Sequence, residues 1–401
     1  MNLPDGLKKL AAIFPVPLYA VGGAVRDFLC GEPCYDIDIC SSLTPDELIP
    51  FLKSRGYKVN EESKRLGTLL ISAGGEQFEY TAFREDSYPL DGSHEPRAVR
   101  FVKDIETDAR RRDFTVNAIY YDIKANRIVD PLNGKADVEK HLIRTVRAPE
   151  IVFKEDALRL LRMVRFAASL SFEIEKETFE TAKKLAFEVT ELSSERIREE
   201  LKKIFVADTV RGIKDAHVRG LDLLFDSNLL QATLPEVSVC ADIKQSGRYF
   251  HSTVYNHLRN TYEVASPDIR FAALVHDIGK LEAHKKTGNY YKHDLYGSEL
   301  VQKVMRRLKF SNAEITEVAT IIRWHMFNVK KPESVEKIRL FLLAHDKYFK
   351  QLVKLMRADR LGGGYPEAHP AFTRLNEIVA VRKKMAAERV PFSLKELNIN
   401  G

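Results

Sequence analysis

The chain has 401 residues, of which 44% are hydrophobic and 30% charged, with a formal net charge of +6. This composition excludes a largely disordered chain, and the length favours two to four domains. No apolar run reaches the roughly 18 residues that span a membrane, and no secretion signal is evident, so we expect a cytoplasmic protein without a membrane partner. The positive charge is compatible with a polyanionic partner.

The first informative segment joins a glycine turn to two nearby carboxylates. Gly22 and Gly23 precede a predicted helix, and backbone N–H groups at such a turn can approach a phosphate closely. Asp36 and Asp38 fit a short strand, where alternate side chains point to the same face. Like charges on one face repel unless a cation lies between them, and Mg²⁺ prefers oxygen ligands. Either feature alone is common in turns and solvated strands, but together they predict a phosphate and metal site.

A strand pair and a loop are expected next. Residues 67–72 and 77–82 flank a glycine turn and read as two neighbouring strands. Alternation along the second strand would place Glu79 beside the paired aspartates. Residues 85–100 show no periodicity and are expected to form a long loop, of the kind that often acts as a lid.

Three consecutive arginines, residues 110–112, are followed by Asp113 and Asn117. Such a run is costly inside a folded domain unless it faces anions or water. From spacing alone, an anion site and a solvated basic turn are equally good interpretations.

Residues 150–235 have mainly helical periodicity. Within them, Glu155 or Asp156 and Arg159 are expected to share one face of a helix. A surface salt bridge is the plain interpretation of this spacing.

Residues 246–365 are again helical and contain an ordered array of histidines and aspartates. Imidazoles and carboxylates together suit transition metals, Mg²⁺ or Mn²⁺. A single buried histidine is usually a satisfied core residue, but the whole array is poorly explained in that way. The array consists of His257, His276, Asp277, His293, His325 and Asp359. By contrast, the cysteines have no metal-ligand spacing, which favours reduced thiols at Cys30, Cys34, Cys40 and Cys240 over a zinc site.

Five motifs in order across residues 18–205 resemble those of the bacterial tRNA nucleotidyltransferases (CCA-adding enzymes) and poly(A) polymerases of class II. They are the glycine turn with the D-x-D pair, the run RRDFTVNA, the segment DPLNGKAD at 130–137, the segment EDALR at 155–159 and SERIREEL at 194–201. One departure is Cys40-Ser41 after the D-x-D pair, where relatives often have Thr or Ala.

The resemblance implies site residues and partners. It makes Asp36, Asp38 and Glu79 catalytic, with Mg²⁺ bound at the aspartates. CTP and ATP would be the nucleotides, and the acceptor stem of tRNA the other partner. Asp156 and Arg159 would hydrogen-bond the Watson–Crick edge of the incoming base. The implied nucleotide-binding set is Gly22, Gly23, Arg26, Arg112, Asp113, Asn117, Asp156, Arg159 and Arg162.

The second array resembles the HD-domain phosphohydrolases, which are fused to some tRNA nucleotidyltransferases. His257, His276, Asp277 and Asp359 match the core metal ligands, and His293 and His325 match the additional pair of two-metal members. The implied metal is Mn²⁺, Ni²⁺, Mg²⁺ or Fe²⁺. Phosphoester hydrolysis is one implied role, and metal binding without turnover is the alternative.

The expected fold is α+β: a head with a small mixed β-sheet, followed by all-helical neck, body and HD domains. Expected boundaries are 1–140 for the nucleotidyltransferase head, 141–205 for the neck, 206–245 for an RNA-binding body, 246–365 for the HD domain and 366–401 for a C-terminal helical segment. Residues 392–401 resemble a segment that leads into a further helical region in relatives, as expected either of a truncated chain or of a naturally short form.

Template-independent addition of C, C and A to tRNA is the main hypothesis. One alternative is a poly(A) polymerase or an enzyme that adds only A or only CC. Relatives that stop at CC lack part of the loop before the arginine run, whereas residues 84–104 have the length of the full loop here, so we expect terminal A addition to be possible. Another alternative is a phosphohydrolase or RNA-binding protein with a vestigial transferase site. The sequence leaves the oligomeric state open.

Overall fold

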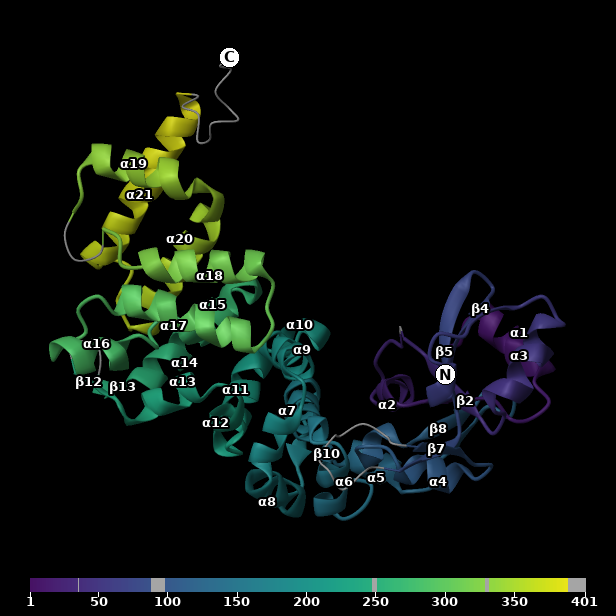
Figure 1. The fold of residues 1–401 in the computed structure, drawn as a ribbon. Helices are drawn as coiled ribbons and strands as arrows, with labels where there is room; N and C mark the ends of the chain where they lie inside the picture. Colours follow the sequence, from purple (N-terminus) through teal and green to yellow (C-terminus); the bar gives the residue numbers. More distant parts are fainter. Residues whose placement is uncertain (35, 88–97, 247–250, 329–331, 389–401) are drawn as a thin grey trace. The chain divides into compact units, whose positions relative to one another are not determined.

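The computed structural model describes residues 1–34, 36–87, 98–246, 251–328 and 332–388. The chain forms two compact units, residues 1–192 and residues 193–401 (Figure 1). The first contains a mixed β-sheet and the second is almost entirely helical, which confirms the α+β class. The boundary between the units falls within the segment expected to be the neck. In the described part of the chain, no helix is long and apolar enough to cross a membrane.

The sheet of the first unit has seven strands in the order β3-β4-β5-β2-β1-β8-β9. Strand β2 lies at its centre, parallel to β5 and antiparallel to β1. The predicted strand pair is confirmed as β4 and β5. The strands are β1 (Tyr19–Val21), β2 (Asp38–Ser41), β3 (Lys58–Asn60), β4 (Thr68–Ala73), β5 (Glu76–Ala82), β8 (Tyr120–Asp122) and β9 (Arg127–Val129).

The two faces of this sheet have different surroundings. On one face, Phe14 packs against Tyr80 of β5 and against Phe51, with ring centroids 6.3 and 6.1 Å apart. On the other face, Cys40 and Tyr120 belong to a buried cluster with Phe83, Ala109 and Val152. Because alternate residues of a strand point to opposite faces, Asp38 shares the face of Cys40.

The prediction of a loop over residues 85–100 is wrong at both ends of this range, where the structure has strands. Strand β6 (Arg84–Ser87) pairs antiparallel with β7 (Ala98–Phe101). Charged residues make up much of this hairpin, so backbone pairing stabilises it without the apolar alternation that identifies a strand in sequence. Residues 88–97, to which the lid hypothesis mainly applies, lie outside the described residues.

The segment around Asp156 also differs from expectation. Helix α6 ends at Glu155, Asp156 has extended backbone angles (φ −145°, ψ 103°), and α7 begins at Leu158. The single helical face predicted for this segment is therefore wrong. The helices of the first unit are α1 (Asp5–Ile13), α2 (Gly23–Leu29), α3 (Pro45–Lys53), α4 (Ile105–Arg110), α5 (Gly134–Glu139), α6 (Pro149–Glu155), α7 (Leu158–Leu170) and α8 (Lys176–Lys184), with short parallel strands β10 (Leu142–Ile143) and β11 (Glu173–Ile174).

The second unit confirms the helical prediction, apart from a short hairpin of β12 and β13. Within it, α14 packs on α15 and α20, and α17 packs on α18 (Figure 1). The elements are α9 (Ser194–Phe205), α10 (Ala207–Arg211), α11 (Ala216–Asp226), α12 (Leu229–Thr233), α13 (Pro235–Ser238), β12 (Lys244–Ser246), β13 (His251–Thr253), α14 (Val254–Val264), α15 (Arg270–Val275), α16 (Lys280–Thr287), α17 (His293–Arg307), α18 (Asn312–Trp324), α19 (Val335–His345), α20 (Phe349–Gly362) and α21 (Pro370–Ala387).

Two candidate functional sites

Three carboxylates gather at the start of the central strand of the first unit. Strand β2 begins at Asp38. Asp36 therefore lies just before the strand, whereas the sequence predicted that it would lie on it. The register between Ile39 and Tyr80 places Asp38 and Glu79 side by side on one face. Loss of solvent around Asp38, followed by the charges of Glu79 and Asp36, raises its pKa to about 6 against the opposing effect of Arg112. A divalent cation would relieve this repulsion.

The glycine turn leaves space beside these carboxylates. Gly22 has φ of 77° and follows Val21, which pairs with Asp38 across the sheet. A Cβ at Gly22 would lie 3.9 Å from Oδ2 of Asp38, and one at Gly23 would lie 3.6 Å from Nη2 of Arg26. Side chains at this turn would therefore occupy the space next to both charged groups, and glycine keeps that space open.

A chain of hydrogen bonds connects α2 to α7. Nη1 of Arg26 donates to Oδ1 of Asn117 at 2.5 Å, and Nδ2 of Asn117 donates to Oδ1 of Asp113 at 3.1 Å. Nη2 of Arg162 lies 2.7 Å from Oδ2 of Asp113. Burial alone would raise the pKa of Asp113, but Arg162 and the Asn117 hydrogen bond outweigh it and hold the pKa at about 2. Four of the predicted nucleotide-binding residues are thus brought together.

Arg159 is buried, and its guanidinium is engaged by its own surroundings. It donates to Glu155 at 3.0 Å and to two backbone carbonyl oxygens, of Val152 and Arg111, at 3.1 and 2.7 Å. Oδ1 of Asp156 accepts from the backbone N–H two residues on, at 3.1 Å. The salt bridge considered as the plain interpretation is therefore present, and the base-reading role of Asp156 and Arg159 stays a prediction.

Arg112 contacts a carboxylate that the sequence analysis missed. Its Nη2 lies 3.1 Å from Oδ2 of Asp108, and its Nε donates to the hydroxyl of Tyr120 at 3.1 Å. Asp108 is completely buried. A spacing of four residues is a standard pairing distance within a helix, but α4 ends at Arg110, so this contact depends on the fold beyond the helix.

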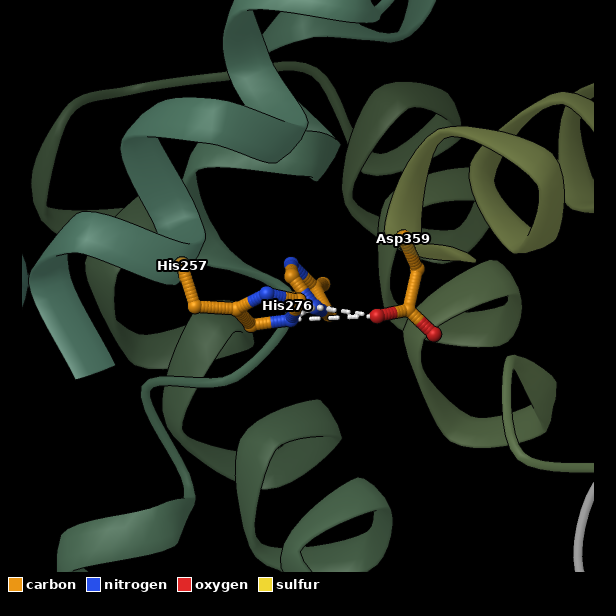
Figure 2. A group of neighbouring side chains, drawn as sticks. All are labelled: His257, His276 and Asp359. Carbon is orange, nitrogen blue, oxygen red and sulfur yellow. Dashed lines mark hydrogen bonds and ion pairs between the residues drawn. The ribbon is translucent and has the colours of Figure 1, made fainter. Parts of the chain in front are cut away.

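The histidine and aspartate array of the second unit meets in its interior. Figure 2 shows His257 of α14, His276 at the end of α15 and Asp359 of α20 directed toward one another. Oδ1 of Asp359 lies 3.0 Å from Nε2 of His257 and 3.5 Å from Nε2 of His276. The two Nε2 atoms are 3.2 Å apart. These three predicted ligands come from three different helical segments.

Asp277 connects this trio to a second histidine pair. Its Oδ2 lies 3.3 Å from Nε2 of both His257 and His276. Its Oδ1 lies 3.2 Å from Nε2 of His293 and 3.7 Å from Nε2 of His325. All six predicted ligands are therefore together, with one carboxylate between two halves, as a bridge between two cations would require.

Backbone carbonyl groups orient three of the imidazoles. Nδ1 of His276, His293 and His325 lies 2.8, 2.8 and 2.6 Å from the carbonyl oxygen three residues earlier. A proton on Nδ1 leaves Nε2 as the acceptor, which is the arrangement of metal-ligating histidines. Core histidines that merely satisfy their own hydrogen bonds have no reason to direct their Nε2 atoms at one another.

The charges of the cluster also favour a cation. Burial lowers the pKa of His276, but the nearby carboxylates of Asp277 and Asp359 outweigh it and raise the pKa to about 10. Burial, His293 and His276 together lower the pKa of His325 to about 4. Nζ of Lys280 lies 2.5 Å from Oδ2 of Asp277, a contact that the sequence analysis missed at a spacing of three residues. Asp277 and Asp359 thus place two negative charges among the imidazoles, and Lys280 compensates part of the charge of Asp277.

Comparison with known families matches three segments of the chain. Residues 18–144 match the family described as "Poly A polymerase head domain", and residues 171–240 match "Probable RNA and SrmB- binding site of polymerase A". Residues 252–361 match "HD domain". The first match contains the carboxylate site and the third contains the whole histidine cluster.

Similar curated proteins are CCA-adding enzymes. The protein of Oceanobacillus iheyensis is 35% identical over 276 residues, covering 69% of this chain and 64% of the relative. That of Staphylococcus aureus is 42% identical over 186 residues, covering 46% and 45%. That of Ligilactobacillus salivarius is 31% identical over 318 residues, covering 76% and 73%. The chain thus spans less than two thirds of the length of the first two relatives.

Two solved structures share the fold. The CCA-adding enzyme of Bacillus stearothermophilus in complex with CTP superimposes with a TM-score of 0.66 at 23% identity, covering 99% of this chain and 86% of the other. A tRNA nucleotidyltransferase complexed with a primer tRNA and an incoming ATP analog has a TM-score of 0.57 at 19% identity, covering 96% and 100%.

Fold and sites together define a nucleotidyltransferase head of the poly(A) polymerase type, followed by an HD domain. On the similarity to the Ligilactobacillus salivarius protein over most of both chains, this chain belongs to the CCA-adding enzyme family.

Proposed function

We propose that the chain is a template-independent tRNA nucleotidyltransferase that adds C, C and A to the 3′ end of tRNA from CTP and ATP. The observation that carries the proposal is the carboxylate trio beside the open glycine turn. Membership of the CCA-adding enzyme family supports it.

Asp36, Asp38 and Glu79 are the residues that would hold Mg²⁺. Their oxygen-only donor set, and the mutual repulsion that raises the pKa of Asp38, fit a hard divalent cation. Bound Mg²⁺ would lower the pKa of the RNA 3′-hydroxyl and neutralise the triphosphate. The open turn at Gly22 and Gly23 offers backbone N–H groups to the phosphates, without a side chain in the way.

The remaining nucleotide contacts come from residues that the fold holds rigidly. Asn117 fixes the guanidinium of Arg26, and Asp113 fixes that of Arg162, so both cations are preorganised for an anionic ligand. We assign Arg112 to the triphosphate, and Asp156 and Arg159 to the exocyclic amine and ring atoms of cytosine or adenine. In that role, Arg159 would exchange part of its present hydrogen bonding for the base.

The helical segments that follow the head would bind the RNA partner. We assign residues 141–205 to a neck and 206–245 to a body that contacts the acceptor stem through its phosphates and shape, which need no sequence readout. The net charge of +6 and the RNA-binding match over residues 171–240 support this assignment.

The test uses purified protein, tRNA lacking its CCA end, Mg²⁺, and CTP, ATP or both, with products resolved to one nucleotide. CTP alone should add two residues, and both nucleotides should add three. Long tails from ATP alone would indicate a poly(A) polymerase. Addition only of A, or arrest after CC, would indicate a partial activity, and no extension would indicate a vestigial site.

A second candidate activity is metal-dependent phosphoester hydrolysis by the HD domain. The oriented imidazoles and Asp277 would hold one or two cations, Mn²⁺, Ni²⁺, Mg²⁺ or Fe²⁺, and such cations polarise a phosphate and activate water. A cavity of about 400 Å³ lies at His293 and is lined by Lys292, by the exposed ring of Tyr291 and by Arg323, which forms an ion pair with Asp294 of the same cavity. Lys292 and Tyr291 could contact the phosphate and the base of a nucleotide.

Metal analysis and a hydrolysis assay test this activity together. Protein purified without chelator should contain a divalent metal and release phosphate from 2′,3′-cyclic nucleotides or simple phosphoesters. Bound metal without turnover would leave a structural site, and absence of metal would refute the proposal.

A further inference from the structure

We propose that Asp108 is a positioning residue for nucleotide transfer, which holds Arg112 in place to receive the phosphates of the incoming nucleotide. The proposal rests on the function proposed above. Asp108 lies on α4, three and four residues before the arginines that it binds, and its side chain is completely buried. Asp108 does not belong to the carboxylate trio, and it would act on the nucleotide only through the arginines that it holds.

Both oxygens of Asp108 are saturated with donors. Oδ1 accepts from Nε of Arg111 at 2.7 Å and from the backbone N–H of Arg84 at 3.3 Å. Oδ2 accepts from Nη2 of Arg112 at 3.1 Å and from the hydroxyl of Tyr120 at 2.6 Å. Such a carboxylate, receiving four donors out of contact with water, fixes each donor in one orientation.

Arg112 is held by two of its three nitrogen atoms. Tyr120 and Asp108 engage its Nε and Nη2, and its side chain remains 15% exposed. Among the described residues, its Nη1 group makes no hydrogen bond. A guanidinium fixed in this way keeps donor capacity at Nη1 for a phosphate oxygen.

The sheet register brings Tyr120, the partner of Arg112, into one row with the carboxylate site. Tyr120 of β8 pairs with Val21 of β1, and Val21 pairs with Asp38 of β2. Directly paired residues point to the same face of a sheet, so Tyr120, Val21 and Asp38 form one row on one face. Arg112 packs over the Tyr120 ring at 5.2 Å, and its charge also lowers the pKa of Asp38.

Two carboxylates connect the hairpin of β6 and β7 to the arginine run. Asp108 accepts from the backbone N–H of Arg84. Asp86 of β6 lies 2.9 Å from Nε of Arg84 and 3.7 Å from Nη1 of Arg111. Together, the guanidinium groups of Arg84, Arg111 and Arg112 and these two carboxylates leave one net positive charge. Asparagine at position 108 could accept on one side only, because its amide group would face two donors on the other.

The experiment measures CTP binding by isothermal titration calorimetry with Mg²⁺ and, separately, KM and kcat for CTP with tRNA lacking CCA. We expect Asp108→Asn to raise Kd and KM for CTP about tenfold and to change kcat less than about threefold. Tyr120→Phe removes one donor without altering charge and should give a smaller rise in the same direction. Glu106→Gln is the matched control, because Glu106 forms an exposed ion pair with Arg110 on the same helix.

A purely structural role predicts a different pattern. It would lower the thermal midpoint and the active fraction, hence kcat, while CTP bound to the folded protein keeps its wild-type Kd. An unchanged Kd in both Asp108→Asn and Tyr120→Phe, with an active wild type, would overturn this inference alone. Wild-type protein that neither binds CTP nor extends tRNA would overturn the proposed function as well.

Discussion

The two candidate metal centres are built in different ways. The head site is made of carboxylates only, and Asp36, Asp38 and Glu79 keep exposed surface, although neighbouring atoms partly desolvate the carboxylate of Asp38. In the HD cluster, five of the six residues are buried and Asp359 is partly exposed, and carbonyl groups fix three of the imidazoles. A hard, exchangeable cation that arrives with a nucleotide suits the first, whereas a resident cation suits the second. On the proposed function, the difference teaches that one chain can combine a metal site that its substrate completes with a metal site that folding assembles.

The largest effect is expected from Asp38→Ala. Loss of a metal ligand removes several kcal/mol of transition-state stabilisation, so nucleotide addition should fall about a thousandfold. Binding of tRNA, measured by gel shift, should stay within about twofold, because the RNA contacts proposed above lie in residues 141–245. Glu76→Gln, an exposed carboxyl on the same strand as Glu79, is the control. A variant that keeps more than about a tenth of wild-type turnover would place the site elsewhere.

The double substitution His276→Ala and Asp277→Ala tests the second metal centre, the HD cluster, separately from the head site. It should abolish any HD-dependent phosphoester hydrolysis and remove the bound divalent metal, as measured by elemental analysis. Because a resident cation stabilises only the folded state, the thermal midpoint should fall as well. Nucleotide addition should stay within about twofold of wild type. A parallel loss of addition would show that the two centres are not independent.

Arg159→Ala should reduce discrimination against UTP and GTP about tenfold, because a guanidinium that reads the base edge contributes about 1–3 kcal/mol. Competition assays with paired nucleotides measure this ratio, and Asp156→Ala should act in the same direction. Glu155→Gln provides the diagnostic control, since it weakens the salt bridge while leaving Arg159 in place. If both Arg159→Ala and Glu155→Gln lose stability and keep discrimination, the salt bridge is the whole role of the residue.

The smallest effect concerns acid stability. Arg111 and Arg112 outweigh burial and lower the pKa of Asp108 from 3.8 to about 2. Because the pKa of this carboxyl is lower in the folded than in the unfolded protein, its ionised form stabilises the folded state above pH 4, by about 2 kcal/mol. That contribution is lost as the pH falls from 4 through 2. Urea unfolding should therefore show wild type more stable than Asp108→Asn at pH 7, with the difference narrowing below pH 4. A difference independent of pH would contradict the assigned charge.

Sequence patterns predicted the groups of residues whose types and spacing along the chain are recognisable. The glycine turn, the arginine run and the ordered histidines are visible as residue types at fixed spacing, and the structure brings each group together. The same patterns failed where geometry depends on distant partners. The break at Asp156 and the charged hairpin of β6 and β7 show no apolar periodicity from which they could be predicted. The roles of Asp108 and Lys280 follow from contacts in the folded chain, of Asp108 with arginines and of Lys280 with the carboxylate of Asp277.

The most direct test of the central claim is a reaction with all four nucleoside triphosphates present. Purified wild-type protein would be incubated with Mg²⁺ and tRNA lacking its CCA end, and the product 3′ ends would be sequenced. We predict that nearly all extended molecules end in CCA and stop there. Unextended tRNA, runs of A, or free incorporation of U and G would contradict the assignment of the head as a CCA-adding site.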